Sequence, residues 1–356
     1  MSITKRPLPA GTFEITSAQA DFCNHSLSTF TKGTYGVPDF GGGGGMEFIR
    51  IFGASRLLSL ALFLSWPAAQ GADLLADFQD SPLTSEHGRV RQIELRTPRL
   101  LHVGSHVLAF HSPGSMLHFR FAEPVWVLAY ETEIHDADGK KPAENFLCHT
   151  FFGNQNVEQL GTADGKVISK EMKVLFSDAF TREIRLPEGF GLRLSTDDKI
   201  DWMPMFNNRG DNVTRVGMRA KVHFIREADL KKPLQPLHGI VKAVQMPHLF
   251  FVPPGRHEKE TTFELPFDGR IHFAGAHIHP HVESIALFNV SRGELICKGL
   301  AEEDGDGETI GMDTYSDVEG YRIRTGEKFR LTSVYDNPTE FPIDAMAGAF
   351  IYYTRD

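Results

Sequence analysis

The sequence predicts an all-β protein made of two tandem, jelly-roll-like antiparallel β-sandwich domains. Short runs rich in Val, Ile, Phe and Thr recur along the chain, bounded by Gly, Pro, Asp or Asn, which is the pattern of strands and turns. No segment after residue 72 carries a convincing helical period. The 356 residues, 41% of them hydrophobic, suffice for one large or two ordinary domains, each with its own core.

Charge and composition exclude several classes of protein. The formal net charge is -9 and no basic stripe is visible, which argues against a nucleic-acid partner. Three cysteines are too few for a disulfide scaffold. The chain has no Gly-x-Ser-x-Gly motif, no P-loop and no Cys-x-x-Cys motif, so these common catalytic and redox classes are not indicated.

The first 72 residues precede the expected mature protein. Residues 1–45 are polar and turn-forming and end in a glycine run, so we expect a disordered or non-native leader, with translation starting at Met46. Residues 46–72 combine two arginines, the apolar run 57–64 and a small-residue site at Ala69-x-Gly71, the pattern of a secretory signal peptide. The run is short for a bilayer span, so we expect a secreted or periplasmic protein that is not membrane-spanning after signal removal. The alternative is a longer leader with an anchoring helix.

The first predicted domain covers residues 73–232. Its expected strands are 107–110, 117–121, 125–130, 184–186, 190–194 and 216–224. An apolar run at 144–154 is interrupted by Cys148 and His149. Two prolines and two lysines at 231–237 favour an extended, exposed connection and set the domain boundary.

The second predicted domain covers residues 233–356. Its expected strands are 263–267, 270–276, 285–290, 321–325, 329–334 and 347–353. The acidic segment 302–308 lacks the spacing and the flanking helices of an EF-hand, so we expect a solvated loop.

A histidine cluster in the second domain indicates a metal site. His277 and His279 are two residues apart, so on a strand they project from the same face and could share a metal. Neutral imidazole suits copper, zinc, iron and nickel. His281 follows a proline, which leaves its direction open. The alternative is a pair of hydrogen-bonded polar side chains near a strand end.

Several motifs in the second half resemble, in the same order, the C-terminal domain of the ascorbate-dependent type II copper monooxygenases, the group of peptidylglycine α-hydroxylating monooxygenase and dopamine β-monooxygenase. They are Val252-Pro253-Pro254-Gly255, His277-x-His279, the turn 324–329 and the segment 343–353 with Met346. The chain is also similar to stress-induced nodulin-like secreted proteins, which share the His-x-His and the late methionine.

This resemblance implies a copper site of His277, His279 and Met346. In the family, such a site binds O2 and hydroxylates a C–H bond, with ascorbate as the external reductant. A thioether favours Cu(I), and three ligands leave a position open for O2. The alternative for Met346 is core packing, since methionine is a common gap-filler.

The first half departs from the family at its second copper site. The run Arg185-Leu186-Pro187-Glu188-Gly189 is similar to a family landmark that lies between the ligands of the electron-transfer copper. A His-His pair precedes that landmark in the family, where this chain has Cys148-His149, and Met205 stands near the place of the later histidine. The site is therefore either rebuilt from Cys148, His149 and Met205 or lost, with Cys148 and Met205 as buried apolar side chains.

Other residues have weaker support. His272 and His281 are candidates for orienting a metal ligand without binding the metal, and the favoured alternative for His272 is a surface or core residue. An oxidising compartment permits a Cys148–Cys297 disulfide, but two cysteines do not establish one.

Three functions follow as hypotheses. The first is a copper monooxygenase acting on a small or peptide-like substrate that the sequence does not specify. The second is a non-catalytic extracytoplasmic copper binder or carrier. The third is a metal-free adhesion or carbohydrate-binding protein, with Trp126 and Trp202 as stacking residues or, alternatively, core residues.

Overall fold

The structure is a computed structural model, and it describes part of the chain. The expected leader, the expected signal peptide and the expected strand at 107–110 lie outside the described residues. Those residues are 79–102, 111–113, 117–136, 146–154, 158–161, 167–208, 213–246, 248–304 and 309–356.

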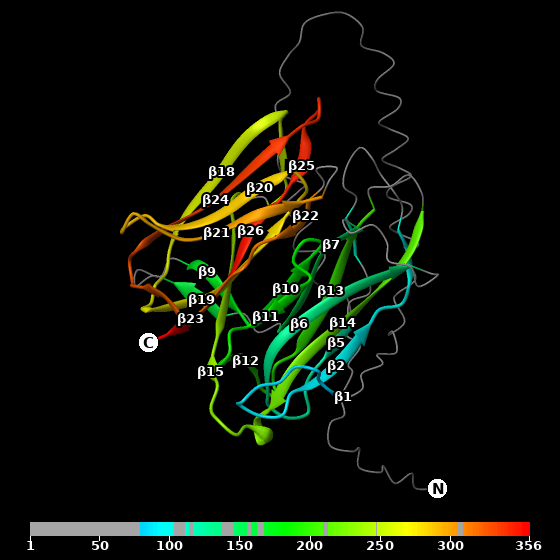
Figure 1. The fold of residues 1–356 in the computed structure, drawn as a ribbon, viewed down its shortest axis with the longest axis vertical. Coiled ribbons are helices and arrows are strands. Elements are labelled where there is room, and N and C mark those ends of the chain that lie inside the picture. The colour runs from blue at the N-terminus through cyan, green and yellow to red at the C-terminus, as the bar shows by residue number, and fades with distance from the viewer. Residues whose placement is uncertain are drawn as a thin grey trace, which may run out of the picture. The chain divides into compact units, whose positions relative to one another are not determined.

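Within these ranges the chain is almost entirely β-structure, which confirms the predicted fold class (Figure 1). The described residues contain no α-helix, and a 3-10 turn spans Glu227–Asp229. Among the described strands, every pair is antiparallel except β12–β15, which is parallel. The jelly-roll connection of each sandwich stays a prediction.

Two sheets come mainly from residues before 233, and we call them the first sandwich. The eight-stranded sheet runs in the order β1 (Gln79–Asp80), β2 (Arg91–Arg96), β14 (Thr214–Arg226), β6 (Val125–Asp136), β12 (Phe190–Leu194) and β15 (Gln235–Pro236), with β11 (Glu183–Arg185) on β6 and β3 (Leu100–His102) on β14. The five-stranded sheet runs β10 (Val174–Asp178), β7 (Leu147–Asn154), β13 (Ile200–Asn207) and β4 (His111–Pro113), with β5 (Leu117–Phe119) on β13.

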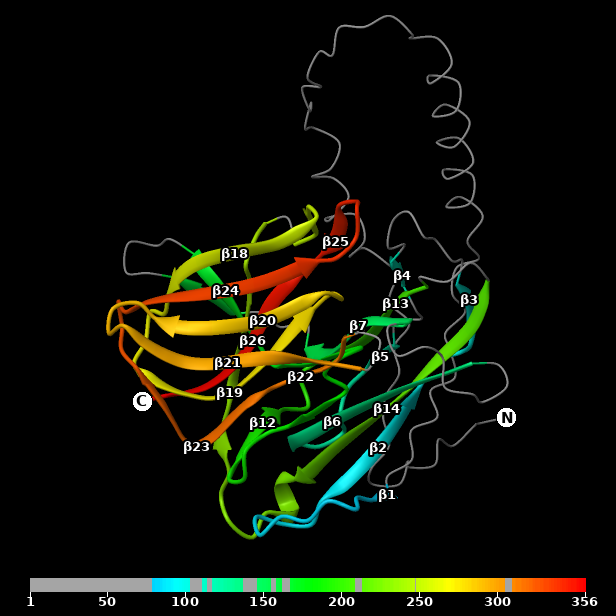
Figure 2. The same cartoon turned by 45° about the horizontal axis from the view of Figure 1, so that its top comes forward.

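Three further sheets form the second sandwich. The six-stranded sheet runs β23 (Tyr315–Ile323), β19 (Gly269–Ile278), β26 (Ala347–Arg355), β16 (His238–Ala243), β9 (Val167–Met172) and β8 (Glu158–Gly161). The five-stranded sheet, seen strand beside strand in Figure 2, runs β18 (Gly255–Glu264), β24 (Lys328–Asn337), β20 (Val282–Asn289), β21 (Glu294–Glu303) and β22 (Thr309–Met312). A small pair joins β17 (Phe250–Val252) to β25 (Ile343–Ala345).

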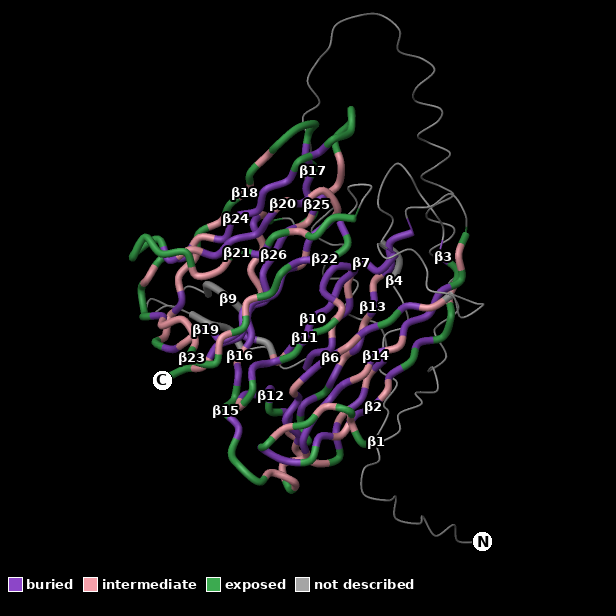
Figure 3. The backbone as a smooth tube through the Cα atoms, in the orientation of Figure 1, coloured by how far each residue is buried: buried purple, intermediate pink, exposed green. Residues whose placement is uncertain are grey.

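Each sandwich buries the facing sides of its sheets, and the purple segments of Figure 3 follow β6, β13 and β14 in the first and β20, β24 and β26 in the second. In the first core, the Trp202 indole donates to the Tyr130 hydroxyl at 2.7 Å. Trp202 is 0% exposed and Trp126 is 7% exposed. Both tryptophans are therefore core residues, so neither offers a surface for stacking on a carbohydrate.

One hairpin crosses the expected boundary at residue 233. Strands β8 and β9 come from the first half of the sequence, yet β9 pairs with β16 in the second sandwich, with Gly239 opposite Met172. The Glu171 carboxylate on β9 is buried and accepts hydrogen bonds from Tyr353 and Arg355 of β26 and pairs with His238 of β16. A buried carboxylate is stable only when it is bonded in this way, so these bonds fasten the hairpin to the second sandwich.

Candidate metal centre

Strand β7 carries a β-bulge at Cys148. Its neighbour β13 pairs Met205 with His149 and Phe206 with Leu147, so Cys148 is the extra residue. In a regular strand, consecutive side chains point to opposite faces, but a bulge re-aims the extra side chain. The Cys148 thiol lies 3.1 Å from His149 Nδ1 as a result. The bulge thus supplies a sulfur and an imidazole at one point of the first sandwich.

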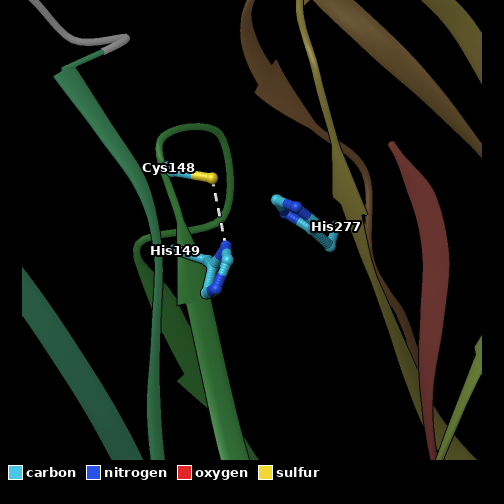
Figure 4. A group of neighbouring side chains, drawn as sticks. All are labelled: Cys148, His149 and His277. Carbon is cyan, nitrogen blue, oxygen red and sulfur yellow. Dashed lines mark hydrogen bonds between the residues drawn. The ribbon is translucent and has the colours of Figure 1, made fainter. Parts of the chain in front are cut away.

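His277 reaches the same point from the second sandwich (Figure 4). Its ring meets the His149 ring edge-on, with centroids 5.0 Å apart. One donor atom each from Cys148, His149 and His277 lie within 4.8 Å of one another. Ligands of a tetrahedral zinc or similar ion lie about 3.3–3.8 Å apart, given metal–nitrogen and metal–sulfur bonds of about 2.0 and 2.3 Å. A small side-chain adjustment would therefore let the three residues hold one ion.

Asp178 orients His277 across the junction between the sandwiches. It ends β10, lies opposite His149 in the sheet register, and is 0% exposed. One carboxylate oxygen accepts from His277 Nδ1 at 3.2 Å and from the Ile278 N–H at 3.3 Å. The other accepts backbone N–H groups of Phe180 and Thr181 at 2.9 and 2.6 Å, which fixes the carboxylate.

This bond determines which nitrogen of His277 is available. A carboxylate only accepts hydrogen bonds, so in the neutral imidazole Nδ1 carries the proton and Nε2 keeps its lone pair. His277 Nε2 is buried and has no hydrogen-bond partner among the described residues. Histidines that bind metals are held in this manner, with the second nitrogen on a carboxylate or carbonyl.

Aromatic side chains enclose the cluster. Phe176 of β10 stacks on Phe350 of β26 with ring centroids 3.8 Å apart, and its edge meets His277 at 5.2 Å. Phe176 also stacks on His149 at 5.8 Å. These rings join the two sandwiches and keep the surroundings of the donors apolar, which strengthens electrostatic interactions there.

His279 lies beside this cluster. Its ring centroid is 5.6 Å from that of His277, its Nδ1 lies 3.0 Å from the Asp344 carboxylate, and it is 3% exposed. A cavity of about 10 Å³, the size of about one water, lies between Cys148 and His279. Asn207 also lines this cavity, and its buried Oδ1 has no hydrogen-bond partner among the described residues. The cavity thus offers a polar position beside the thiol.

Each of the two predicted methionines lies opposite a histidine in the register of neighbouring strands. Met205 is directly opposite His149 on β13. Met346 falls between β25 and β26, and extending the β19–β26 register from the Ile278–Ala347 pair brings it opposite His279. Both methionines are half-buried. The residues predicted for two separate copper sites therefore gather at one junction.

Of the other predicted residues, His272 lies away from the cluster and His281 forms part of a turn. His272 is about 16 Å along β19 from His277 at ordinary strand rise, and its ring nitrogens bond to the Asp317 carbonyl and the Thr354 hydroxyl. His281 adopts a left-handed conformation with φ of 69° in the turn before β20, and its carbonyl accepts the Asp336 N–H. Among the described residues, no disulfide joins Cys148 to Cys297.

Sequence reasoning missed the carboxylates. Asp178 follows a short apolar run at a strand end, and Asp344 lies inside the segment 343–353 that carries the resemblance, so both had a weak signal. It also gave no role to His248, an exposed residue whose pKa is lowered by desolvation and, to a smaller extent, by the charge of His277.

No helix in the described part of the chain is both long and apolar enough to cross a membrane. No protein-family model matches the chain, and no curated protein matches it. Among solved structures, the infectious bursal disease virus VP2 subviral particle is similar at 10% identity and a TM-score of 0.22, over 85% of this chain and 78% of that one. The coconut allergen cocosin is similar at 8% identity and a TM-score of 0.11, over 80% and 85% of the two chains. Scores this low carry no argument about function.

Proposed function

We propose that the protein is an extracytoplasmic copper binder whose ion bridges the two sandwiches through Cys148, His149 and His277. The observation that carries this proposal is the convergence of their three donor atoms within 4.8 Å, from strands of different sandwiches. The bond from Asp178 to His277 supports it, because it leaves a buried imidazole nitrogen directed away from the carboxylate.

Copper is favoured by the donor set. A thiolate with two imidazoles is a soft combination that suits copper, and His2Cys sites with a weak further ligand are a known copper arrangement. Met205, opposite His149, and the buried Asn207 oxygen are candidates for that weak ligand. Zinc accepts the same ligands, so the two metals must be compared directly.

A copper monooxygenase is the second candidate function. It is supported by the neighbouring rings of His277 and His279 at the end of β19, with Met346 directly before the neighbouring strand β26. The cavity beside His279 has room for about one water. An O2-activating site must also admit the substrate, so the binder is the better-supported function.

The test is copper content after loading. The wild-type protein is incubated with equal copper and zinc, desalted and measured by metal analysis, together with Cys148→Ser, His149→Ala and His277→Ala. The control is His257→Ala. His257 lies on β18, and its ring bonds to the Pro254 carbonyl. We expect one copper per wild-type and control chain, and loss of at least half in each ligand variant. A metal-free wild type, or equal copper in all variants, would refute the proposal.

The enzymatic alternative is tested separately. Copper-loaded protein is mixed with ascorbate and a panel of small and peptide-like substrates, and O2 uptake is compared with that of free copper. Substrate-dependent uptake above the free-copper rate would favour the monooxygenase, and copper binding without it would favour the binder.

A further inference from the structure

We propose that the second sandwich contains a binding site for a small, neutral aromatic molecule, in a cavity between its two large sheets. This site is separate from the metal centre and does not depend on the proposed function. The cavity has a volume of about 210 Å³. Ala274, Ala276 and Ala349 line it from the six-stranded sheet, and Ile285, Leu287 and Leu331 line it from the five-stranded sheet.

The cavity exists because its walls carry small side chains. Ala276 and Ala349 lie side by side on the neighbouring strands β19 and β26, and both belong to the buried core of this sandwich. Most protein interiors leave few voids larger than a water. Two alanines at one level of a sandwich core leave space that larger aliphatic side chains would fill, and this space is suited to a ligand.

The volume and the lining define the ligand class. An apolar cavity of about 150 Å³ is sufficient to bind benzene, so this one accommodates a single aromatic ring with a small substituent. The six residues named above are all aliphatic and buried. A charged group placed among these six side chains would lose its hydration without compensation, so the part of the bound molecule that lies there must be neutral.

One side of the cavity allows a polar substituent. Lys298, Asp313 and Thr314 line it and are exposed, so they mark the side where it reaches solvent. Cys297 also lines it, and burial raises the pKa of this thiol to about 12, which keeps it uncharged at neutral pH. A phenol, with an apolar ring and one hydroxyl directed to this side, matches these features.

The cavity and the metal centre use opposite faces of β19. Side chains alternate along a strand, so Ala274 and Ala276 point into the sandwich while His277 points toward the first sandwich. Consistent with this, Ala274 and Ala276 belong to the second core, while His277 contacts His149 and Phe176. Filling the cavity therefore tests this site without replacing a metal ligand.

The test is calorimetric titration of the full chain with benzene and with phenol, supported by thermal unfolding with each probe. The wild type is expected to bind one molecule of either probe, to show competition between them, and to unfold at a higher temperature in their presence. Ala349→Leu places a larger side chain in the cavity and should weaken both probes at least tenfold.

Ala347→Leu is the matched control. Ala347 lies two residues away on the same strand and in the same core, is 3% exposed against 5% for Ala349, and does not line the cavity. This variant should bind both probes within threefold of wild type. Ala276→Leu repeats the test from the opposite strand if Ala349→Leu does not fold. No binding to the wild type, equal binding in the filled variants, or equal loss in the control would overturn the proposal.

Discussion

The two sandwiches contribute their residues to the metal centre in different ways. On the first sandwich, a bulge places two adjacent residues, Cys148 and His149, at one point. On the second, His277 lies near the end of β19 and His279 follows two residues later, just past the strand, with the two ring centroids 5.6 Å apart. The supporting carboxylates differ as well, because Asp178 reaches across to His277 whereas Asp344 holds His279 from within its own sandwich.

This difference shows what each half of the metal centre depends on. The relative position of His277 and His279 is set by one segment of chain and its neighbouring strands, so it would persist in any second sandwich that folds. The position of His277 relative to Cys148 depends on Asp178 and on the packing of Phe176 against Phe350. The junction, more than either sandwich, therefore determines whether three donors meet.

The largest expected effect is a loss of stability at acid pH that originates in the first sandwich. His102 is 2% exposed between Phe146 and Phe206, and burial lowers its pKa to about 4 from the ordinary 6.5. The unfolded chain therefore binds a proton more readily than the folded protein. Protonation of His102 does not reduce the free energy of unfolding above pH 6.5, and reduces it as the pH falls from 6.5 toward 4. The loss is about 3 kcal/mol.

His102→Leu should remove that part of the pH dependence. Urea unfolding of both proteins at pH 7, 5.5 and 4.5 would measure it. Equal pH slopes for the variant and the wild type would show that His102 does not contribute to acid lability.

The next effect compares the two carboxylates. Asp178→Asn should lower copper affinity roughly 10- to 100-fold, because partners that orient metal-binding histidines have effects of that size. Asp344→Asn should change it much less, since His279 is not one of the three proposed ligands. Competition with a chromophoric copper chelator measures both affinities, and thermal unfolding identifies any variant that fails to fold. An equal loss in both variants would mean that His279 is a ligand.

A smaller effect tests the hairpin that links the two halves. Glu171→Gln keeps the shape of the side chain but removes the charge that accepts from Tyr353 and Arg355. We expect a loss of about 2 kcal/mol in the free energy of unfolding, the usual cost of weakening buried, charge-assisted hydrogen bonds. Glu258→Gln on β18 serves as a control, and an equal change in both variants would contradict the assigned role.

The smallest effect distinguishes the two candidate metal sites. Met346→Leu conserves volume, so the free energy of unfolding should change by less than about 1.5 kcal/mol. Copper stoichiometry should also stay at one per chain, because Met346 is not among the three proposed ligands. Metal analysis of the loaded variant checks this. Loss of copper would instead support a site of His277, His279 and Met346.

The sequence predicted the all-β fold because alternation and turn residues are local signals, and residues such as Trp202 and Tyr130 carry the core pattern clearly. The shared face of His277 and His279 follows from the same alternation. The proximity of Cys148 to His277 could not be predicted, because it needs a bulge and a contact between residues 129 positions apart. Asp178 was missed for the same reason, since its partner lies in the other sandwich.

The hairpin of β8 and β9 has a consequence for anyone who dissects this protein. A fragment that starts at residue 233 would lack the strand that pairs with β16, which would leave a row of backbone N–H and C=O groups open at a sheet edge. Such an edge recruits strands from other molecules. Expressing the second half alone is therefore expected to give aggregates, and a cut in the sequence at the proline-rich connection would not correspond to a cut in the structure.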